Sequence, residues 1–198
     1  MVAGLILAAG RSTRMGRPKA LLTQVFTRRT FVAHLISASH EAGLTAVLVI
    51  GQAANVELAA EVDRVGATLL VNDTPERGQL SSILVGLDAA ERLDASAILV
   101  MPVDVPLVSS TVIAQIVAAA NRSDARIVRA THAGRHGHPV LFKRSVFDEV
   151  RSADPSIGAR AVVRVDPARV LDVEVNDPGV TLDIDTPEDY RRAFGVEL

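Results

Sequence analysis

The stretch Leu7–Lys19, which reads LAAGRSTRMGRPK, follows directly on the apolar residues Leu5 and Ile6. An apolar run of this kind predicts a buried strand that leads into a loop. Glycines and basic residues are concentrated in that loop: Gly10, Gly16, Arg11, Arg14, Arg17 and Lys19. Glycine lets the backbone turn tightly and bring its N–H groups close to an anion, and basic side chains neutralise that anion. The stretch therefore predicts a strand end that binds a polyphosphate.

The loop differs from the two commonest phosphate-binding motifs. The spacing from Gly10 to Gly16 is one residue too long for a Walker A motif, no Lys-Ser/Thr pair follows it, and no GxGxxG occurs. Taken alone, these residues also allow an ordinary surface turn, so the rest of the chain has to decide between the two interpretations.

Size and composition narrow the class of protein. The 198 residues suffice for one α/β domain with a substantial core, and the expected domain is residues 1–198. A formal net charge of −2, with both signs interspersed, argues against a nucleic-acid binder, because such proteins need a basic face. The chain has no cysteine, which excludes disulfides and thiolate chemistry and fits the cytoplasm. Neither a signal peptide nor a membrane partner is expected.

Short apolar runs alternate with helical patterns along the chain. The expected strands are Leu5–Ala8, Ala46–Ile50, Thr68–Val71, Ala97–Met101, Arg126–Ala130, Val140–Phe142 and Val170–Val175. The expected helices are Phe31–Ala42, Val56–Arg64, Ser81–Arg92 and Val112–Asn121. This alternation predicts a three-layer, Rossmann-like α/β fold, in which helices cover both faces of a mostly parallel sheet. Ligands of such sheets bind beyond the carboxyl ends of the strands.

Three acidic residues lie where such a ligand is expected. Asp104 follows the apolar run Ala97–Met101, which places it at the carboxyl end of a buried strand. It is either a turn residue before Pro106 or a carboxylate of the ligand site. Asp183 and Asp185 are two residues apart, so both point to one side of an extended segment. Either can serve a hard cation, which prefers oxygen ligands.

The segment Thr186–Asp189 predicts the start of a helix. Thr186 suits the N-cap and Pro187 the first helical position, and Asp189 can return its carboxylate to the cap. Glu188 and Asp189 are therefore expected to support the helix rather than to bind a metal.

Histidines and serines offer two further kinds of site. His132, His136 and His138 lie in an expected loop, and a zinc site there would lack a fourth ligand of standard type or spacing. Ser81 and Ser82 open an expected helix, where hydroxyl and N–H groups suit nucleotide recognition. A serine nucleophile is not expected, because the chain has no G-x-S-x-G elbow.

Further short segments are specific as an ordered set. They are Gly78–Ile83 (GQLSSI), Asp104–Pro106 (DVP), Gly137–Pro139 (GHP) and Asp183–Tyr190 (DIDTPEDY). With the loop pattern LAAG-x-S-x-RMG-x-x-K, they make the chain resemble the MobA-like nucleotidyltransferases over nearly its whole length. Within that family it is most similar to the molybdenum cofactor cytidylyltransferases. The resemblance implies a fold like that of the nucleotide-diphospho-sugar transferases.

The resemblance also implies roles for individual residues. Arg14, Lys19 and Asp104 are the expected catalytic residues, and Mg²⁺ is expected on Asp104 and Asp185. Nucleotide contacts are expected from two segments: Leu7, Ala8, Ala9, Gly10, Arg11, Ser12, Gly16 and Lys19, then Gly78, Ser81 and Ser82. Acceptor contacts are expected from His138 and from Arg160, for which a solvated helix arginine is the alternative.

Two departures from the family pattern qualify these expectations. Val103 and Val105 replace the Gly and Gln of the commoner L-G-D-Q-P wording, so contacts made by that Gln are in doubt. The segment Gln24–Arg29 stands where the family has a short glycine turn, and its sequence suggests no function.

The resemblance implies CTP as the nucleotide, with GTP less favoured. GTP-using members tend to read L-A-G-G, and the methyl of Ala9 crowds a purine more than a pyrimidine if it faces the base. The implied acceptor is the phosphate of a molybdenum-bearing pterin, and a molybdoenzyme or its maturation chaperone is a further candidate partner. Two alternatives stay open: transfer to a sugar or another small phosphate, and a non-catalytic maturation factor that binds the cofactor.

Overall fold

A seven-stranded sheet forms the centre of the computed structural model, which describes residues 1–53 and 55–198. The strands follow the order β5-β4-β1-β6-β8-β7-β9. Their bounds are β1 Val2–Leu7, β4 Ala46–Gly51, β5 Thr68–Val71, β6 Ala97–Pro102, β7 Ile127–His132, β8 Arg135–Lys143 and β9 Val170–Glu174. β8 runs antiparallel to both of its neighbours, and the other neighbouring pairs are parallel. The predicted mostly parallel sheet is thus confirmed.

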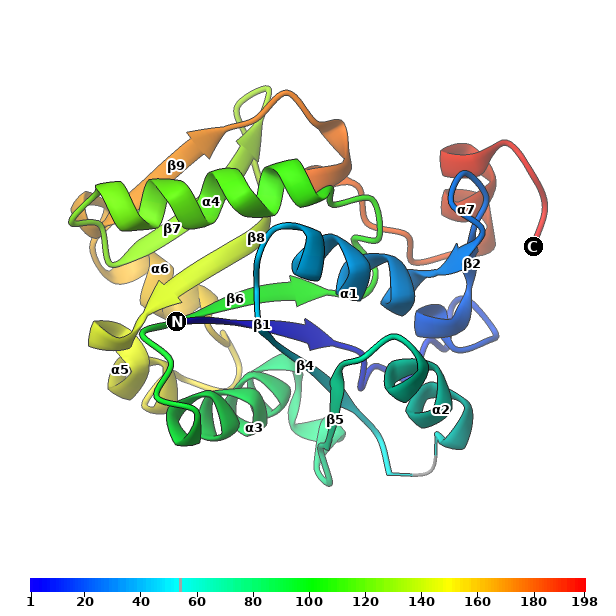
Figure 1. Cartoon of the computed structure of the whole chain (residues 1–198), viewed down its shortest axis with the longest axis horizontal. Coiled ribbons are helices and arrows are strands. Elements are labelled where there is room, and N and C mark those ends of the chain that lie inside the picture. The colour runs from blue at the N-terminus through cyan, green and yellow to red at the C-terminus, as the bar shows by residue number, and fades with distance from the viewer. Residues whose placement is uncertain (54) are drawn as a thin grey trace.

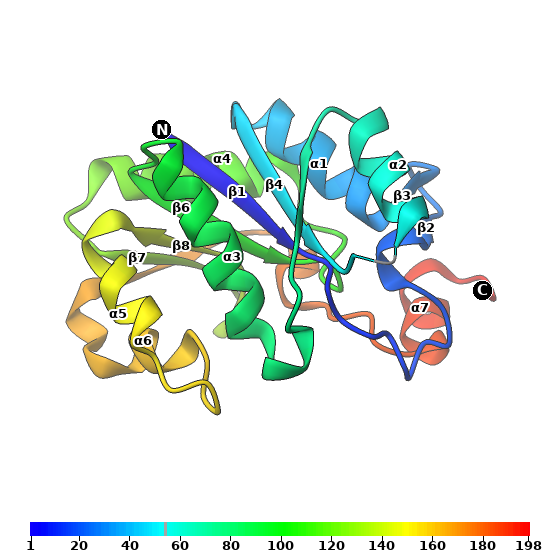
Figure 2. The ribbon, with the colours of Figure 1, turned by 90° about the horizontal axis from the view of Figure 1, so that it is seen from below.

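Helices cover both faces of the sheet (Figures 1 and 2). On one face lie α1 (Phe31–Glu41), α2 (Val56–Arg64) and α4 (Ser110–Arg122), and on the other lie α3 (Gln79–Arg92), α5 (Phe147–Arg151) and α6 (Arg160–Val165). Alternation along β1 explains both layers, since Leu5 and Leu7 pack toward α3 while Ile6 packs toward α1. The three-layer architecture is therefore confirmed, with every predicted strand and helix present and boundaries shifted by a few residues.

The carboxyl-terminal helix α7 (Pro187–Phe194) begins as predicted. The Thr186 hydroxyl accepts a hydrogen bond from the Asp189 N–H, and the Asp189 carboxylate accepts one from the Thr186 N–H. This capping box fixes the chain directly after Asp185. Gly195, in the left-handed region with φ 72°, ends the helix.

The loop predicted around His132, His136 and His138 is instead a β-hairpin. His132 ends β7, and β8 already starts at Arg135 and includes the other two histidines. The turn residues Ala133 and Gly134 both have positive φ, 49° and 73°, as a tight hairpin turn requires. The prediction was wrong because backbone pairing extends this hairpin beyond the apolar residues that signal a strand.

A second, two-stranded hairpin was not predicted. It consists of β2 (Thr23–Gln24) and β3 (Arg29–Thr30) and lies beside α7 (Figures 1 and 2). The Tyr190 hydroxyl of α7 donates to the Thr23 carbonyl at 2.7 Å. No helix in the part of the chain that the structure describes is both long enough and apolar enough to cross a membrane.

Candidate active site

The loop after β1 closes on itself around Ser12. The Ser12 carbonyl accepts hydrogen bonds from the N–H groups of Met15 and Gly16, both at 3.1 Å, and the Ser12 hydroxyl accepts from the Lys19 N–H at 3.1 Å. Positive φ occurs at Ser12 (51°) and at Gly16 (75°), but not at Gly10. The turn attributed to Gly10 is thus made at Ser12, whose two acceptors compensate for the strained backbone. A Cβ at Gly10 would meet nothing within 4 Å, so the space beside it is open to a ligand.

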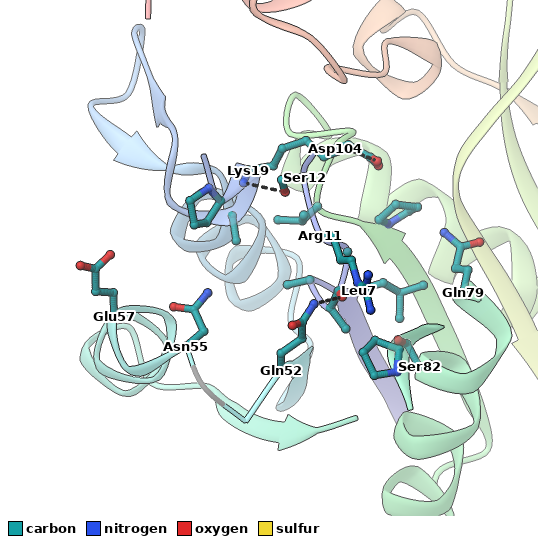
Figure 3. Close-up of a pocket in the computed structure, with 18 of the residues that line it drawn as sticks. Leu7, Arg11, Ser12, Lys19, Gln52, Asn55, Glu57, Gln79, Ser82 and Asp104 are labelled. Atoms are coloured by element: carbon teal, nitrogen blue, oxygen red, sulfur yellow. Dashed lines mark hydrogen bonds and ion pairs between the residues drawn. The ribbon is translucent and has the colours of Figure 1, made fainter. Parts of the chain in front are cut away.

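A cleft of about 930 Å³ opens beside this loop. One wall comes from the start of α2, with Gln52, Asn55 and Glu57, and the opposite wall from the start of α3, with Gly78, Gln79 and Ser82 (Figure 3). The loop residues from Leu7 to Ser12 form the floor together with the end of β6 and the two residues after it, Val103 and Asp104. The cleft therefore lies at the carboxyl ends of β1, β4 and β6, where ligands of open α/β sheets bind.

Lys19 joins the two carboxylates that the sequence marks for a metal. Its Nζ lies 2.8 Å from Asp104 Oδ2 and 2.8 Å from Asp185 Oδ1. Arg14 Nη2 lies 2.8 Å from the other oxygen of Asp185. Lys19 is largely buried, with a side chain only 10% exposed, whereas Arg14 is 69% exposed. Residues more than 160 positions apart in sequence thus converge at one edge of the cleft.

The charged side chains around Lys19 shift each other's pKa values. Burial works to lower the pKa of the Lys19 ammonium, but Asp104 and Asp185 more than reverse that effect, so the pKa lies above its ordinary value. The hydrogen bond from Lys19, reinforced by Arg14, lowers the pKa of Asp185. Partial burial and the neighbouring carboxylates raise the pKa of Asp183. Lys19 is therefore charged at neutral pH.

The donor set fits Mg²⁺. Asp104 and Asp185 direct one oxygen each at a single cation, here the Lys19 ammonium. Carboxylate oxygens are the ligands that Mg²⁺ prefers, and it commonly takes one or two of them together with substrate phosphates. Among residues 1–53 and 55–198, no group of three or more His, Asp or Glu side chains is placed to hold a metal ion. The two carboxylates would consequently need phosphate oxygens to complete the coordination.

The two serines at the start of α3 differ in what they can offer. Ser82 lines the cleft, while the Ser81 hydroxyl lies 2.8 Å from the Gly78 carbonyl and does not line it. Asn72, only 2% exposed, donates to both hydroxyls, at 2.8 Å and 2.9 Å. Asn72 therefore fixes this helix start, and Ser82 is the better placed of the two for a nucleotide contact.

Asp104 and Arg160 both lie close enough to His138 to influence its charge. Burial lowers its pKa to about 4, Asp104 works in the opposite direction, and Arg160 adds to the lowering. Its Nδ1 is shielded from solvent and has no hydrogen-bond partner within the described structure. Gly137 is essential for this placement, because a Cβ there would lie 2.1 Å from the Val180 carbonyl oxygen. His138 is therefore a neutral, shielded imidazole whose neighbours include Asp104 and the exposed Arg160.

Other histidines are engaged elsewhere. His132 Nδ1 lies 2.8 Å from the Val175 carbonyl oxygen, and exposed His136 lies beside Asp172 and Arg129. These contacts give the hairpin a structural role and bring neither ring to the cleft.

The sequence interpretation missed several residues of the cleft. Gln52 donates from Nε2 to the Ala9 carbonyl at 2.6 Å and lines the wall next to Asn55 and Glu57, and Gln79 lines the opposite wall. A signal was available for Gln52, because it directly follows β4 and the rule that singled out Asp104 applies equally there. Gln79 also had a signal, because it lies within the Gly78–Ile83 segment. Glu57 had none, since exposed polar residues in a first helical turn are common.

The segment Gln24–Arg29 contacts the loop that carries Asp104. Gln24, only 3% exposed, donates to the Pro106 carbonyl at 3.3 Å and accepts from the Thr27 hydroxyl. Because Pro106 follows Asp104 by two residues, this hairpin helps to hold the loop that carries the carboxylate. The segment without an assigned function therefore has a positioning role.

Comparisons with known proteins agree with this architecture. The model of the MobA-like NTP transferase domain matches residues 4–172. The purine catabolism protein PucB of Bacillus subtilis is 29% identical, and the match covers 96% of each chain. A phosphoenolpyruvate guanylyltransferase of Mycolicibacterium gilvum is 28% identical over 94% of this chain and 86% of that protein. A probable molybdenum cofactor guanylyltransferase of Bacillus cytotoxicus is 31% identical over 58% of this chain and 55% of that protein.

Solved structures give the same picture. Rv0371c from Mycobacterium tuberculosis is 27% identical and superposes with a TM-score of 0.82, covering 99% of both chains. A structure of that protein in complex with manganese has a TM-score of 0.77 and covers 98% of both. The named relatives include guanylyltransferases, so they do not reproduce the expected similarity to the cytidylyl branch.

Proposed function

This chain belongs to the MobA-like NTP transferase family, and we propose that it transfers CMP from CTP to the phosphate of a molybdenum-bearing pterin. The proposed cofactor is Mg²⁺, and pyrophosphate is the second product. The nucleotidyltransferase class comes with the family, while the base, the metal and the acceptor are our proposal. One observation carries it: Lys19, Asp104 and Asp185 meet at the edge of a cleft whose floor is the Leu7–Ser12 loop.

Nucleotidyl transfer needs positioning and charge neutralisation more than covalent help. The acceptor phosphate must meet the α-phosphorus in line, and charge on the departing pyrophosphate must be neutralised. Backbone N–H groups of the loop from Gly10 to Gly16 would hold the phosphates, with Arg14 and Lys19 as cationic partners. When bound by Asp104 and Asp185, Mg²⁺ supplies Lewis-acid stabilisation of phosphate charge. The acceptor is already an anion at neutral pH, so the mechanism requires no general base.

CTP is favoured by the residue at position 9. Ala9 lines the cleft, and Gln52 binds its carbonyl, so the Ala9 backbone is held in place beside the ligand space. A methyl fixed there leaves less room for a purine than glycine would. The guanylyltransferase names of several relatives favour GTP instead, and GTP is therefore the alternative nucleotide.

The proposed acceptor contacts are His138 and Arg160, next to Asp104. An exposed guanidinium suits a phosphate, and a neutral imidazole can donate one hydrogen bond to it. The relative named for phosphoenolpyruvate supports a second candidate, transfer to another small phosphate.

A non-catalytic maturation factor is the alternative of a different class. Such a factor could bind the pterin and pass it to a molybdoenzyme, directly or through a chaperone. The convergence of two carboxylates with Arg14 and Lys19 argues against a pure carrier, because holding a cofactor requires no paired metal ligands.

The test supplies purified protein with Mg²⁺ and the molybdenum-loaded pterin, adds CTP or GTP in parallel reactions, and measures pyrophosphate and the dinucleotide. We expect product with CTP, and we expect Ala9→Gly to gain activity with GTP. Product with GTP alone would reject the base assignment and keep the class. Pyrophosphate release with another phosphate acceptor, but not with the pterin, would reject the acceptor, and no release with any acceptor would favour the carrier.

A further inference from the structure

Four side chains at the edge of the cleft neutralise each other completely. We call Arg14, Lys19, Asp104 and Asp185 the exchange cluster. Lys19 binds one oxygen of each carboxylate, and Arg14 binds the second oxygen of Asp185, all at 2.8 Å. The groups proposed to hold the metal are thus occupied by the groups proposed to hold the phosphates.

We propose that the exchange cluster makes metal and triphosphate bind as one coupled event, in which the metal takes over the two carboxylates and the phosphates take over the two cations. This inference rests on the proposed function of the same residues. It adds an energetic coupling between the two ligands that is built into the protein and is distinct from their affinity for each other in water.

Either ligand alone meets an obstacle. A divalent metal arriving alone has to compete with Lys19 for both carboxylates. Lys19 is only 10% exposed in its side chain, so an ammonium released from the carboxylates would stay desolvated nearby. A triphosphate arriving alone would draw Arg14 and Lys19 away and leave two unpaired carboxylates facing its own negative charge.

Both obstacles vanish when the ligands arrive together. The positive and negative members of the exchange cluster each gain a new partner of opposite charge, and none is left unpaired. Linkage requires the effect to be reciprocal, so the metal strengthens triphosphate binding by the factor by which the triphosphate strengthens metal binding.

The first test measures Mn²⁺ binding by electron paramagnetic resonance, without nucleotide or acceptor. Lys19→Met frees Asp104 and one oxygen of Asp185 while keeping a long apolar side chain. We therefore expect Mn²⁺ to bind on the order of 10-fold tighter than to the unchanged protein. The matched control is Lys143→Met, which removes the chain's other lysine, whose Nζ contacts the Ser123 carbonyl. This control should bind Mn²⁺ as the unchanged protein does.

Arg14→Met provides a second variant whose folding is not at risk, because Arg14 is 69% exposed. It should gain Mn²⁺ affinity in the same direction by a smaller factor. Adding Asp104→Asn to Lys19→Met should remove the gain, which locates the bound ion. Equal Mn²⁺ affinity in Lys19→Met, Arg14→Met and the unchanged protein would overturn the inference.

The reciprocal test measures the binding of an anion without metal. It follows inorganic tripolyphosphate in the presence of EDTA, which removes divalent metal ions. Asp185→Asn removes one of the two carboxylates that a metal-free anion would leave unpaired, so this variant should bind tripolyphosphate several-fold tighter than the unchanged protein. Equal or weaker binding would contradict the coupling. Neither probe contains a base or an acceptor, so these results can fail while CTP-dependent product formation succeeds, and the reverse can also occur.

Discussion

His138 is the residue near the cleft whose ionisation is displaced furthest by its surroundings, with a pKa lowered to about 4 by burial. Above pH 6.5 the imidazole is neutral in both the folded and the unfolded chain. Between pH 6.5 and 4 the unfolded chain binds a proton that the folded chain excludes. The free energy of unfolding should therefore decrease as the pH is lowered from 6.5 to 4. His138 contributes at most about 3 kcal/mol to this decrease.

Urea unfolding at pH 7 and pH 4.5 measures this contribution by difference. His138→Gln has no titrating imidazole, so it should lose less stability between the two pH values than the unchanged protein. His136→Gln is the matched control, because it removes an exposed imidazole from the same hairpin. An identical loss in His138→Gln and the unchanged protein would show that His138 titrates normally.

At the scale of elements, helix α7 links stability to the site, because its cap directly follows Asp185. Thr186→Ala removes the hydroxyl that accepts from the Asp189 N–H, and we expect a loss of about 1 kcal/mol in the free energy of unfolding. Denaturant titration checks this against Thr111→Ala, an exposed threonine inside α4. If Thr186→Ala lowered the free energy of unfolding no more than Thr111→Ala does, the capping box would contribute nothing to stability.

Elements with strong local signals could be predicted, and those set by distant contacts could not. The α7 cap is visible in four consecutive residues, and α2 is bounded by Asn55 and a regular apolar pattern. The β2–β3 hairpin is different, because its buried anchor Gln24 is satisfied by Pro106, 82 positions away. No local sequence pattern in Gln24–Arg29 indicates that Gln24 will bind the Pro106 carbonyl.

At the scale of the whole molecule, two apolar layers share one sheet. Leu87 of α3 belongs to one layer and Leu35 of α1 to the other, and both are fully buried. Since the same strands contribute to both layers, we propose that residues 1–198 are one cooperative unit. Leu87→Ala and Leu35→Ala should each cost about 2–5 kcal/mol and lower one common transition.

Calorimetry and far-ultraviolet circular dichroism can check this by comparing midpoints. The two methods should report the same melting temperature for each variant. Two separate transitions, one moved by each substitution, would instead indicate independently unfolding layers.

The position of the site was easier to predict from the sequence than the side-chain contacts within it. The carboxyl-end rule places the Leu7–Lys19 loop and Asp104 at the same edge of the sheet, and the structure adds that β1 and β6 are neighbours there. The contact of Asp185 with Lys19 spans 166 positions and depends on where α7 packs. Sequence patterns report local conformation and burial, so the place of Glu57 in the wall of the cleft emerged only from the fold.

The most direct test of the central claim is the turnover of Asp104→Asn in Mg²⁺-dependent transfer from CTP to the pterin phosphate. The substitution keeps the shape of the side chain and removes its charge, so we expect turnover to fall on the order of 10²-fold or more. Asp94→Asn is the matched control, because Asp94 is 93% exposed, pairs with Arg144, and does not line the cleft. A turnover of Asp104→Asn close to that of Asp94→Asn, with Mg²⁺ still required, would contradict the account.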